Sequence, residues 1–253
     1  MAIKKPLNPR ERIILALDVD DFNVAQDIVR ELKDYVGFFK VGLQLYTSCG
    51  FDVVEMIQSN GGRVFFDGKF HDIPNTVARA CANLVKRDID FFDIHIKGGS
   101  KMLSTTVRLA QETAKKYEKE QPTILGVTLL SSFGQRTLNQ ELGVDLTIDD
   151  YVARLANLAQ QANLNGVVAS ASEARKIREI CGEDFLIVCP AVRPTWSVVD
   201  DQVRVVTPTD AIKAGVDYMI VGRPIINASD RVEACNMIIA EIENAIQDSL
   251  MNV

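Results

Sequence analysis

Residues 63–76 read RVFFDGKFHDIPNT, and this stretch joins a strand pattern to an unusual density of charge. The apolar run VFF at 64–66 predicts a buried strand, and Asp67 and Lys69 follow it on one face because side chains alternate along a strand. A turn after this strand would bring Asp72 back beside them. Like charges repel and burial penalises every ion, so such a cluster is costly to assemble unless its charges are used. The stretch therefore predicts a lysine held between two carboxylates at the carboxyl end of a strand.

The rest of the chain repeats the same order of strand and helix. Pro74 is suited to the first turn of a helix, where its missing N–H costs nothing. Expected strands occupy residues 13–17, 38–41, 64–66, 91–94, 123–127, 166–169, 185–188 and 218–221, and expected helices occupy residues 24–35, 51–58, 75–86, 102–119, 149–162, 172–180, 209–214 and 232–249. Eight alternations predict one α/β domain over residues 1–253, a (β/α)8 TIM barrel, with a doubly wound open sheet as the alternative.

The composition is that of an ordinary globular protein, with 47% hydrophobic and 25% charged residues. The formal net charge is -6 and no block of lysines and arginines stands out, so binding to nucleic acid or to an anionic membrane is not expected. No stretch approaches the roughly 18 apolar residues of a membrane span. The five cysteines lack CxxC spacing, which favours a reducing compartment over disulfides or a zinc site. We expect a cytoplasmic protein.

Polar residues gather at the carboxyl ends of the expected strands, the face where barrels carry their active sites. They are Asp18, Lys40, Asp67, Lys69, His95, Lys97, Ser131, Ser132, Arg193, Gly222 and Arg223. Two long loops, 131–148 and 190–208, would lie on the same face, and loops of this length are usually functional or disordered.

Most of these residues also have a structural explanation when they are taken singly. Asp18 would suit a helix cap, Lys40 a solvated strand end and Arg223 a surface ion pair. Gly222 and Arg223 taken alone are best explained as a turn. They could also bind a phosphate, because glycine lets the anion approach the backbone and arginine donates two hydrogen bonds.

No metal or cofactor is expected. The only histidines, His71 and His95, belong to no HxH or HExxH motif, and we expect both to have structural roles. The sequence contains no GxSxG elbow, no GxGxxG fingerprint and no Walker A loop, so neither a Ser-His-Asp triad nor a nucleotide cofactor is indicated.

The segment DGKFHDIPNT at 67–76 resembles the DxKxxDIPxT signature of the orotidine 5'-monophosphate decarboxylase family. Nearly the whole chain shares the likeness, with LALDVD at Asp18, KVG at Lys40, HIKGGSKM at His95, VRP at Arg193, DDQVR at Gln202 and VGRPI at Arg223. The DxKxxD core alone is shared with sister barrels, whereas the blocks together are specific. Two departures are small: Ser131 follows Leu130 where bacterial relatives usually carry threonine, and Ala191 follows Pro190 where they often carry glycine.

The resemblance implies a cofactor-free conversion of orotidine 5'-monophosphate to uridine 5'-monophosphate and CO2, the last step of pyrimidine nucleotide synthesis. Loss of CO2 leaves a carbanion at C6 in the plane of the ring, where the π system cannot delocalise it, so the protein must stabilise the charge electrostatically. The resemblance implies that Lys69 does so and then protonates C6. Asp67 and Asp72 would hold Lys69, and Lys40 would complete a chain of alternating charge.

The resemblance also implies how the substrate is bound and that the protein is a homodimer. It implies that Asp18 and Lys40 contact the ribose hydroxyls, that Ser131 contacts the amide edge of the pyrimidine, and that Gln202, Gly222 and Arg223 bind the phosphate. Arg193 is implied to lie in a loop that closes over the substrate. Asp72 and Thr76 are implied to reach the active site of the neighbouring subunit.

Two alternatives remain at this point. One is a Mg2+-dependent sugar-phosphate decarboxylase or aldolase on the same barrel, but those sisters carry a metal-binding glutamate where this chain has Lys40, whose charge would repel Mg2+. The other is a non-catalytic barrel that binds a nucleotide phosphate. Such a binder would keep Ser131, Gln202 and Arg223 but would tolerate the loss of Lys69.

Overall fold

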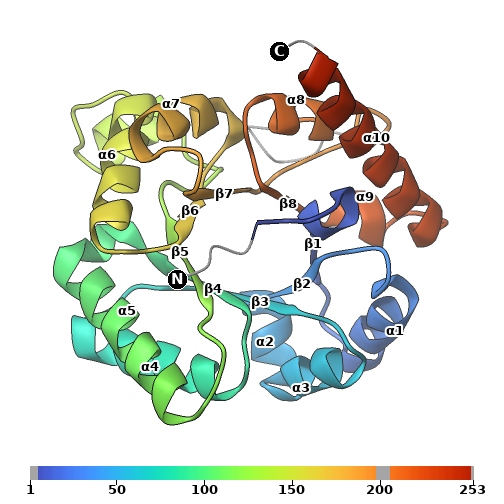
Figure 1. Ribbon diagram of the computed structural model, residues 1–253, viewed down its shortest axis with the longest axis horizontal. Coiled ribbons are helices and arrows are strands. Elements are labelled where there is room, and N and C mark those ends of the chain that lie inside the picture. Colours follow the sequence, from blue (N-terminus) through green and yellow to red (C-terminus); the bar gives the residue numbers. More distant parts are fainter. Residues whose placement is uncertain (1–4, 198–205, 252–253) are drawn as a thin grey trace.

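The computed structural model describes residues 5–197 and 206–251, which form a closed barrel of eight parallel strands surrounded by helices (Figure 1). The strands are β1 (Ile13–Ala16), β2 (Phe38–Gly42), β3 (Val64–Phe70), β4 (Phe91–His95), β5 (Thr123–Val127), β6 (Gly166–Val168), β7 (Leu186–Cys189) and β8 (Tyr218–Val221). They pair in chain order, and β8 closes the barrel against β1 with Ile220 opposite Ile14. The predicted (β/α)8 barrel is confirmed, and the open-sheet alternative is wrong.

The helices cover the outside of the barrel. They are α1 (Phe22–Leu32), α2 (Leu43–Cys49), α3 (Asp52–Ser59), α4 (Pro74–Lys86), α5 (Gly99–Lys116), α6 (Ile148–Gln161), α7 (Ala171–Cys181), α8 (Pro208–Lys213), α9 (Arg223–Ile226) and α10 (Arg231–Met251), with the short turns η1 (Pro9–Arg12), η2 (Ile96–Gly98) and η3 (Thr137–Glu141). All eight expected helices are present. The sequence did not predict α2 and α9, because helices of 7 and 4 residues carry too little periodic pattern.

Apolar side chains form one layer inside the barrel and a second layer between the strands and the helices. Phe38 belongs to the inner layer, whereas its neighbour Phe39 packs outward among the helices. Because both faces of each strand are buried, the strands read as nearly continuous apolar runs rather than as alternating patterns. This is why short runs such as IILA in β1 were recognisable in the sequence.

Aromatic rings close the inside of the barrel and form a floor below its carboxyl end. The ring of Phe91 lies 4.3 Å from that of Phe38, 6.3 Å from that of Phe65 and 5.3 Å from that of Tyr218, measured between centroids. Since the interior is filled at this level, any pocket must lie above the rings, toward the carboxyl ends of the strands.

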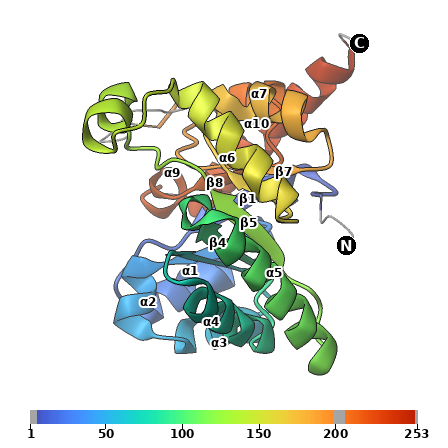
Figure 2. The same cartoon turned by 90° about the vertical axis from the view of Figure 1, so that its left-hand side faces the viewer.

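The long connection 131–148 lies at the carboxyl ends of the strands, as the sequence predicted. Figure 2 shows α2, α9 and the segment after β5 toward the same end of the barrel (left). The connection 131–148 contains the turn η3. Within the second long loop, 190–208, residues 198–205 lie outside the described residues.

A buried ion pair ties α7 to the start of β8. Arg178 Nη2 lies 2.6 Å from Asp217 Oδ2, and both side chains are less than a tenth exposed. The same carboxylate oxygen accepts the N–H of Ile187 at 2.8 Å, and Arg178 also donates to the carbonyl of Gly215 at 2.8 Å. These bonds join three neighbouring segments of the barrel.

Arg178→Met is expected to lower the free energy of unfolding by about 3 kcal/mol, because it leaves the buried carboxylate of Asp217 without its main partner. Of the other cations near Asp217 in the described residues, Lys5 is 3.5 Å away and partly exposed, and Arg12 donates to the backbone carbonyl of Asp217. Urea unfolding measures the loss, with Arg154→Met as the control, since Arg154 is exposed on α6. The control should change stability by less than about 0.5 kcal/mol. Equal unfolding midpoints for Arg178→Met and the wild type would contradict this account.

Candidate active site

Three neighbouring strands place a charged residue directly above the aromatic floor. The triplets FFK at 38–40, FFD at 65–67 and FFD at 91–93 lie in β2, β3 and β4. The first phenylalanine of each triplet faces the interior, and the residue two positions later points the same way. Lys40, Asp67 and Asp93 therefore meet inside the barrel, and each is less than a tenth exposed.

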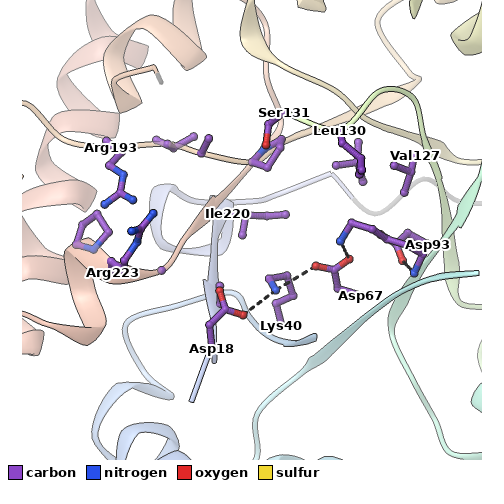
Figure 3. A pocket seen from close by; sticks show the side chains of 18 of the residues that line it. Asp18, Lys40, Asp67, Asp93, Val127, Leu130, Ser131, Arg193, Ile220 and Arg223 are labelled. Atoms are coloured by element: carbon purple, nitrogen blue, oxygen red, sulfur yellow. Dashed lines mark hydrogen bonds and ion pairs between the residues drawn. The ribbon is translucent and has the colours of Figure 1, made fainter. Parts of the chain in front are cut away.

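Four side chains form a chain of alternating charge across this pocket (Figure 3). Lys40 Nζ lies 3.2 Å from Asp18 Oδ1 and 3.0 Å from Asp67 Oδ2. The other oxygen of Asp67 accepts a hydrogen bond from Lys69 Nζ. The structural explanation of Asp18 as a helix cap is wrong, because Asp21 caps α1 by accepting the N–H groups of Asn23 and Val24.

The charged side chains in this row stabilise one another's ionised forms. Burial disfavours the charged form of Lys40, but Asp67 and Asp18 outweigh it and raise the pKa of the lysine above its usual value. Burial likewise opposes ionisation of Asp67, yet the charges of Lys40 and Lys69 prevail and hold the pKa of that carboxyl well below its usual range. Asp67 is therefore a carboxylate at every pH at which the protein would work.

Lys69 reaches Asp67 by a different backbone path from the one predicted. The sequence suggested plain strand alternation, whereas β3 contains a bulge: Phe66 pairs with Phe92 and Phe70 with Ile94, so the register shifts between them. Lys69 itself has a φ of 45°, in the left-handed region that residues other than glycine rarely adopt. The two side chains still converge, but the bulge and not the period of two brings them together.

The other end of the pocket is positively charged. Figure 3 shows Arg193 and Arg223 together, with Ser131 between them and the end that holds Asp67. Arg193 follows β7 and is only 6% exposed. Arg223 is the first residue of α9, and Gly222 precedes it directly after β8. Two guanidinium groups at one end of a cavity favour an anion that accepts bidentate hydrogen bonds, such as a phosphate.

The pocket gathers most of the residues that the sequence singled out. Those lining it are Asp18, Lys40, Asp67, Lys69, Ser131, Arg193, Gly222 and Arg223. Gln202 lies outside the described residues.

Asp72 does not return to the cluster of its own chain, and that sequence prediction is wrong. After β3 the chain leaves the barrel end and enters α4 at Pro74, the first helical position, as predicted. Asp72 is exposed, and its carboxylate accepts the N–H of Ile73 at 2.6 Å. Thr76, in the first turn of α4, is exposed as well. Within one chain, Lys69 therefore has Asp67 as its carboxylate partner and not a flanking pair.

Sequence reasoning missed Asp93, which lines the pocket beside Lys69. Its side chain is 1% exposed, and its Oδ1 accepts the backbone N–H of Lys69 at 2.8 Å. Burial, and then the negative charge of Asp67, raise the pKa of this carboxyl well above its ordinary value. A signal was present in the sequence: an aspartate stands inside the apolar run FFDI, as Asp67 does in VFFD. Apolar walls, including those made by Val127, Leu130 and Ile220, were likewise recognised only in the structure.

Among the residues that the structure describes, no three His, Cys, Asp or Glu side chains come together in a way that could hold a metal ion. The rings of His71 and His95 lie 5.4 Å apart beside the barrel end. In the described part of the chain, no helix has the length and apolar character needed to cross a membrane.

Comparison with known proteins places this geometry in a family. Residues 11–238 match the "Orotidine 5'-phosphate decarboxylase / HUMPS family". The chain is 47% identical over 233 residues to the orotidine 5'-phosphate decarboxylase of Geotalea daltonii, spanning 92% of this chain and 96% of that one. The protein of the same name from Moorella thermoacetica is 45% identical over 237 residues, 94% of each chain. The crystal structure of orotidine 5'-phosphate decarboxylase from Lactobacillus acidophilus matches with a TM-score of 0.81 at 32% identity, covering 94% of this chain and 99% of that chain.

The closed barrel, with a lysine–carboxylate chain above its aromatic floor and arginines beside it, defines a (β/α)8-barrel enzyme whose site lies at the carboxyl ends of the strands. The chain belongs to the orotidine 5'-phosphate decarboxylase / HUMPS family.

Proposed function

We propose that this protein converts orotidine 5'-monophosphate to uridine 5'-monophosphate and CO2, the final step of de novo pyrimidine nucleotide biosynthesis. Family membership and the names of the relatives support this activity. The observation that carries it is the contact of Lys69 Nζ with the buried carboxylate of Asp67, in a pocket whose far end holds two arginines. One end suits a reaction that creates negative charge on carbon, and the other suits a phosphate.

Lys69 is the residue that we propose to carry the chemistry. When the C6–CO2 bond breaks, its electron pair stays on C6 in the plane of the ring, where the π system cannot spread it. An ammonium already fixed nearby stabilises that pair without reorganisation. It then supplies the proton that becomes the C6–H bond of the product, so Lys69 acts as a general acid. The CO2 departs as a neutral molecule. Lys69, which has given up its proton, is then reprotonated from water.

Asp67 and Lys40 keep Lys69 ready for this step. Asp67 is ionised and holds the ammonium of Lys69, while Lys40 on its other side offsets the negative charge. The ammonium is therefore fixed in position before the substrate binds, which is the condition for electrostatic catalysis.

The remaining pocket residues fit the rest of the substrate. We propose that Asp18 and Lys40 bind ribose hydroxyls and that Ser131 binds the amide edge of the pyrimidine. Gly222 and Arg223, with Gln202, would bind the phosphate, and Arg193 would close over it. A phosphate distant from the reacting bond is useful because its binding energy can orient the substrate and drive loop closure.

We further propose a homodimer in which Asp72 and Thr76 complete the active site of the partner subunit. Both are exposed at the end of the chain's own barrel, close to the site in sequence but outside its pocket. Ile73 between them is 68% exposed, and Leu43, directly after the neighbouring strand β2, is 60% exposed. Large apolar side chains on a surface favour burial against another chain.

The compartment is proposed to be the cytoplasm. None of the five cysteines, all of which lie in the described residues, is paired in a disulfide, which suits a reducing environment.

Turnover of orotidine 5'-monophosphate, followed by ring absorbance and CO2 release with and without a chelator, tests the proposed function. We expect rapid turnover that the chelator does not change, because Lys69 and not a metal ion is proposed to stabilise the carbanion. Absence of turnover by the folded protein would refute the activity. Turnover that the chelator abolishes would instead support the magnesium-dependent alternative.

Arg223→Ala is expected to lower kcat/KM for orotidine 5'-monophosphate by about 10- to 100-fold, the usual effect of losing a charge-assisted hydrogen bond. Phosphate-free orotidine should be affected by less than about 3-fold, since it lacks the group that Arg223 binds. Arg136→Ala, which removes an exposed arginine from the loop after β5, is the control. An equal loss on both substrates would show that Arg223 does not bind the phosphate.

A further inference from the structure

Asp93 is a buried carboxyl for which the proposed chemistry has no use. It lies on β4 facing the barrel interior, 1% exposed, and Figure 3 shows it in the pocket beside Asp67. Lys69 lines the same pocket. Its Oδ1 accepts a hydrogen bond, but its Oδ2 is buried without a hydrogen-bond partner among the described residues. Aspartate is almost never buried so completely unless it is paired, so its presence here calls for an explanation.

The backbone around Asp93 indicates what it does. Phe66 of β3 pairs with Phe92 of β4, and Phe70 pairs with Ile94, so residues 67–69 of β3 stand opposite Asp93 alone. The bulge removes the N–H of Lys69 from the ladder between the strands. Asp93 Oδ1 accepts that N–H at 2.8 Å and so replaces the missing ladder partner.

Lys69 needs such support because its backbone is strained. With a φ of 45° it adopts a conformation that residues other than glycine keep only when their surroundings hold them there. The direction of the Lys69 side chain depends on this backbone, and so does its contact with Asp67. A residue that fixes the backbone therefore also fixes the ammonium.

We propose that Asp93 is a positioning residue: its buried carboxyl accepts the N–H of Lys69, holds that backbone in its left-handed conformation and thereby places Nζ against Asp67. The structural part of this inference stands on the geometry of β3 and β4. Its consequence for catalysis rests on the proposed function.

The charges around Asp93 explain why the neutral form is the useful one. Among the described residues, the titratable groups that interact with it are Asp67 and Lys69 from β3 and, at longer range through charge alone, the buried thiol of Cys81 from α4. Burial and the charge of Asp67 raise the pKa of Asp93, and the ammonium of Lys69 is already bound to Asp67. An ionised Asp93 would compete for that ammonium. It would also add a negative charge beside the position proposed for an anionic substrate.

Two substitutions separate the neutral acceptor from an anion. Asp93→Asn keeps a neutral oxygen that can accept the N–H of Lys69, and its kcat should stay within about 3-fold of the wild type. Asp93→Leu removes the acceptor, and kcat should fall about 100-fold, the usual effect of misplacing a catalytic group by about 1 Å. Binding of uridine 5'-monophosphate and KM should change little in either variant. An Asn variant as impaired as the Leu variant would overturn the proposal.

Asp90 provides a matched control at the other end of the same pair of strands. Its Oδ2 accepts the N–H of Val64, the first residue of β3, at 2.9 Å. Asp90→Leu removes the same kind of bond far from Lys69 in the strand, so it should lower the unfolding temperature and leave kcat within about 3-fold. If Asp90→Leu reduced kcat as much as Asp93→Leu, general weakening of β3 would replace positioning as the explanation.

A crystal structure of Asp93→Leu tests the geometry without any assay of activity. We expect Lys69 to leave its positive φ and Nζ to lose its contact with Asp67. An unchanged Lys69 would overturn the proposal even if the protein had no decarboxylase activity, whereas wild-type protein without turnover would refute the proposed function alone.

The pH dependence of unfolding is a further test that needs no assay of activity. Of the variants, it requires only that Asp93→Asn folds. The raised pKa of the buried Asp93 predicts that the native wild type keeps a proton there, which the unfolded chain releases above about pH 4. The native state then binds more protons than the unfolded state, so stability falls as pH rises through this range. The free energy of unfolding of the wild type should therefore fall relative to that of Asp93→Asn as the pH is raised from 4 to 7. A constant difference, or one of the opposite sign, would show that Asp93 is ionised.

Discussion

Lys69→Ala is expected to lower turnover of orotidine 5'-monophosphate by at least about 10^4-fold, because one substitution removes both the cation that stabilises the carbanion and the acid that protonates it. Binding of uridine 5'-monophosphate should stay largely intact. The residues proposed for the ribose, the pyrimidine edge and the phosphate all remain, and Asp67 keeps Lys40 as its partner at 3.0 Å. Single-turnover kinetics and calorimetric titration of the product measure the two effects separately.

The control for this variant is Lys101→Ala, which removes an exposed lysine from α5. It should leave both turnover and product binding unchanged. Substantial residual turnover in Lys69→Ala would refute the assignment of Lys69 as the acid. Loss of product binding in step with turnover would show that the substitution had disrupted the pocket as a whole.

Mixing two inactive variants, Lys69→Ala and Asp72→Ala, is expected to restore about a quarter of the wild-type activity if the active sites are shared between subunits. About half of the dimers would then carry one subunit of each kind. In such a dimer one site combines the intact Lys69 of one chain with the intact Asp72 of the other, while the second site lacks both. Steady-state turnover before and after unfolding and refolding the mixture together measures the gain.

Mixing Lys69→Ala with Asp67→Ala is the matched control. Both substitutions affect the pocket of their own chain, where the two side chains are in contact, so neither site of a mixed dimer is complete. No activity should return. Failure of the first mixture to gain activity over this control would refute the composite site, and activity of Asp72→Ala by itself would show that Asp72 is not needed.

Much of the fold could be predicted because its signals are local. Apolar runs of four or five residues, such as IILA in β1 and TILGV in β5, are buried on both faces, and amphipathic segments such as FNVAQDIVREL in α1 have one apolar side. Their regular alternation left few topologies, because parallel strands joined by right-handed crossovers close into a barrel or form an open sheet. The boundaries were less certain: β3 was expected to end at residue 66 and continues to Phe70.

The part of the candidate site that lies at the ends of neighbouring strands could be predicted from the sequence. Asp18, Lys40, Asp67 and Lys69 follow or end strands that neighbour one another, so their side chains were expected to meet at the barrel end, and they lie in contact. Asp93 was missed because the sequence does not show which backbone group of the neighbouring strand its carboxyl contacts. Its significance comes from the register of β3 against β4.

By itself, the sequence predicted eight alternations of strand and helix, which left a barrel or an open sheet, and it predicted charged residues at the ends of the strands, because periodicity is a property of the local chain. The family followed from the resemblance of its motifs. Only the tertiary structure decided that Lys69 reaches Asp67 through a bulge, that Asp93 supports it and that Asp72 is exposed rather than turned back into the pocket. The physical reason is that these three outcomes depend on strand register and on which buried charges find partners. Both are settled by contacts between segments that are far apart in the chain.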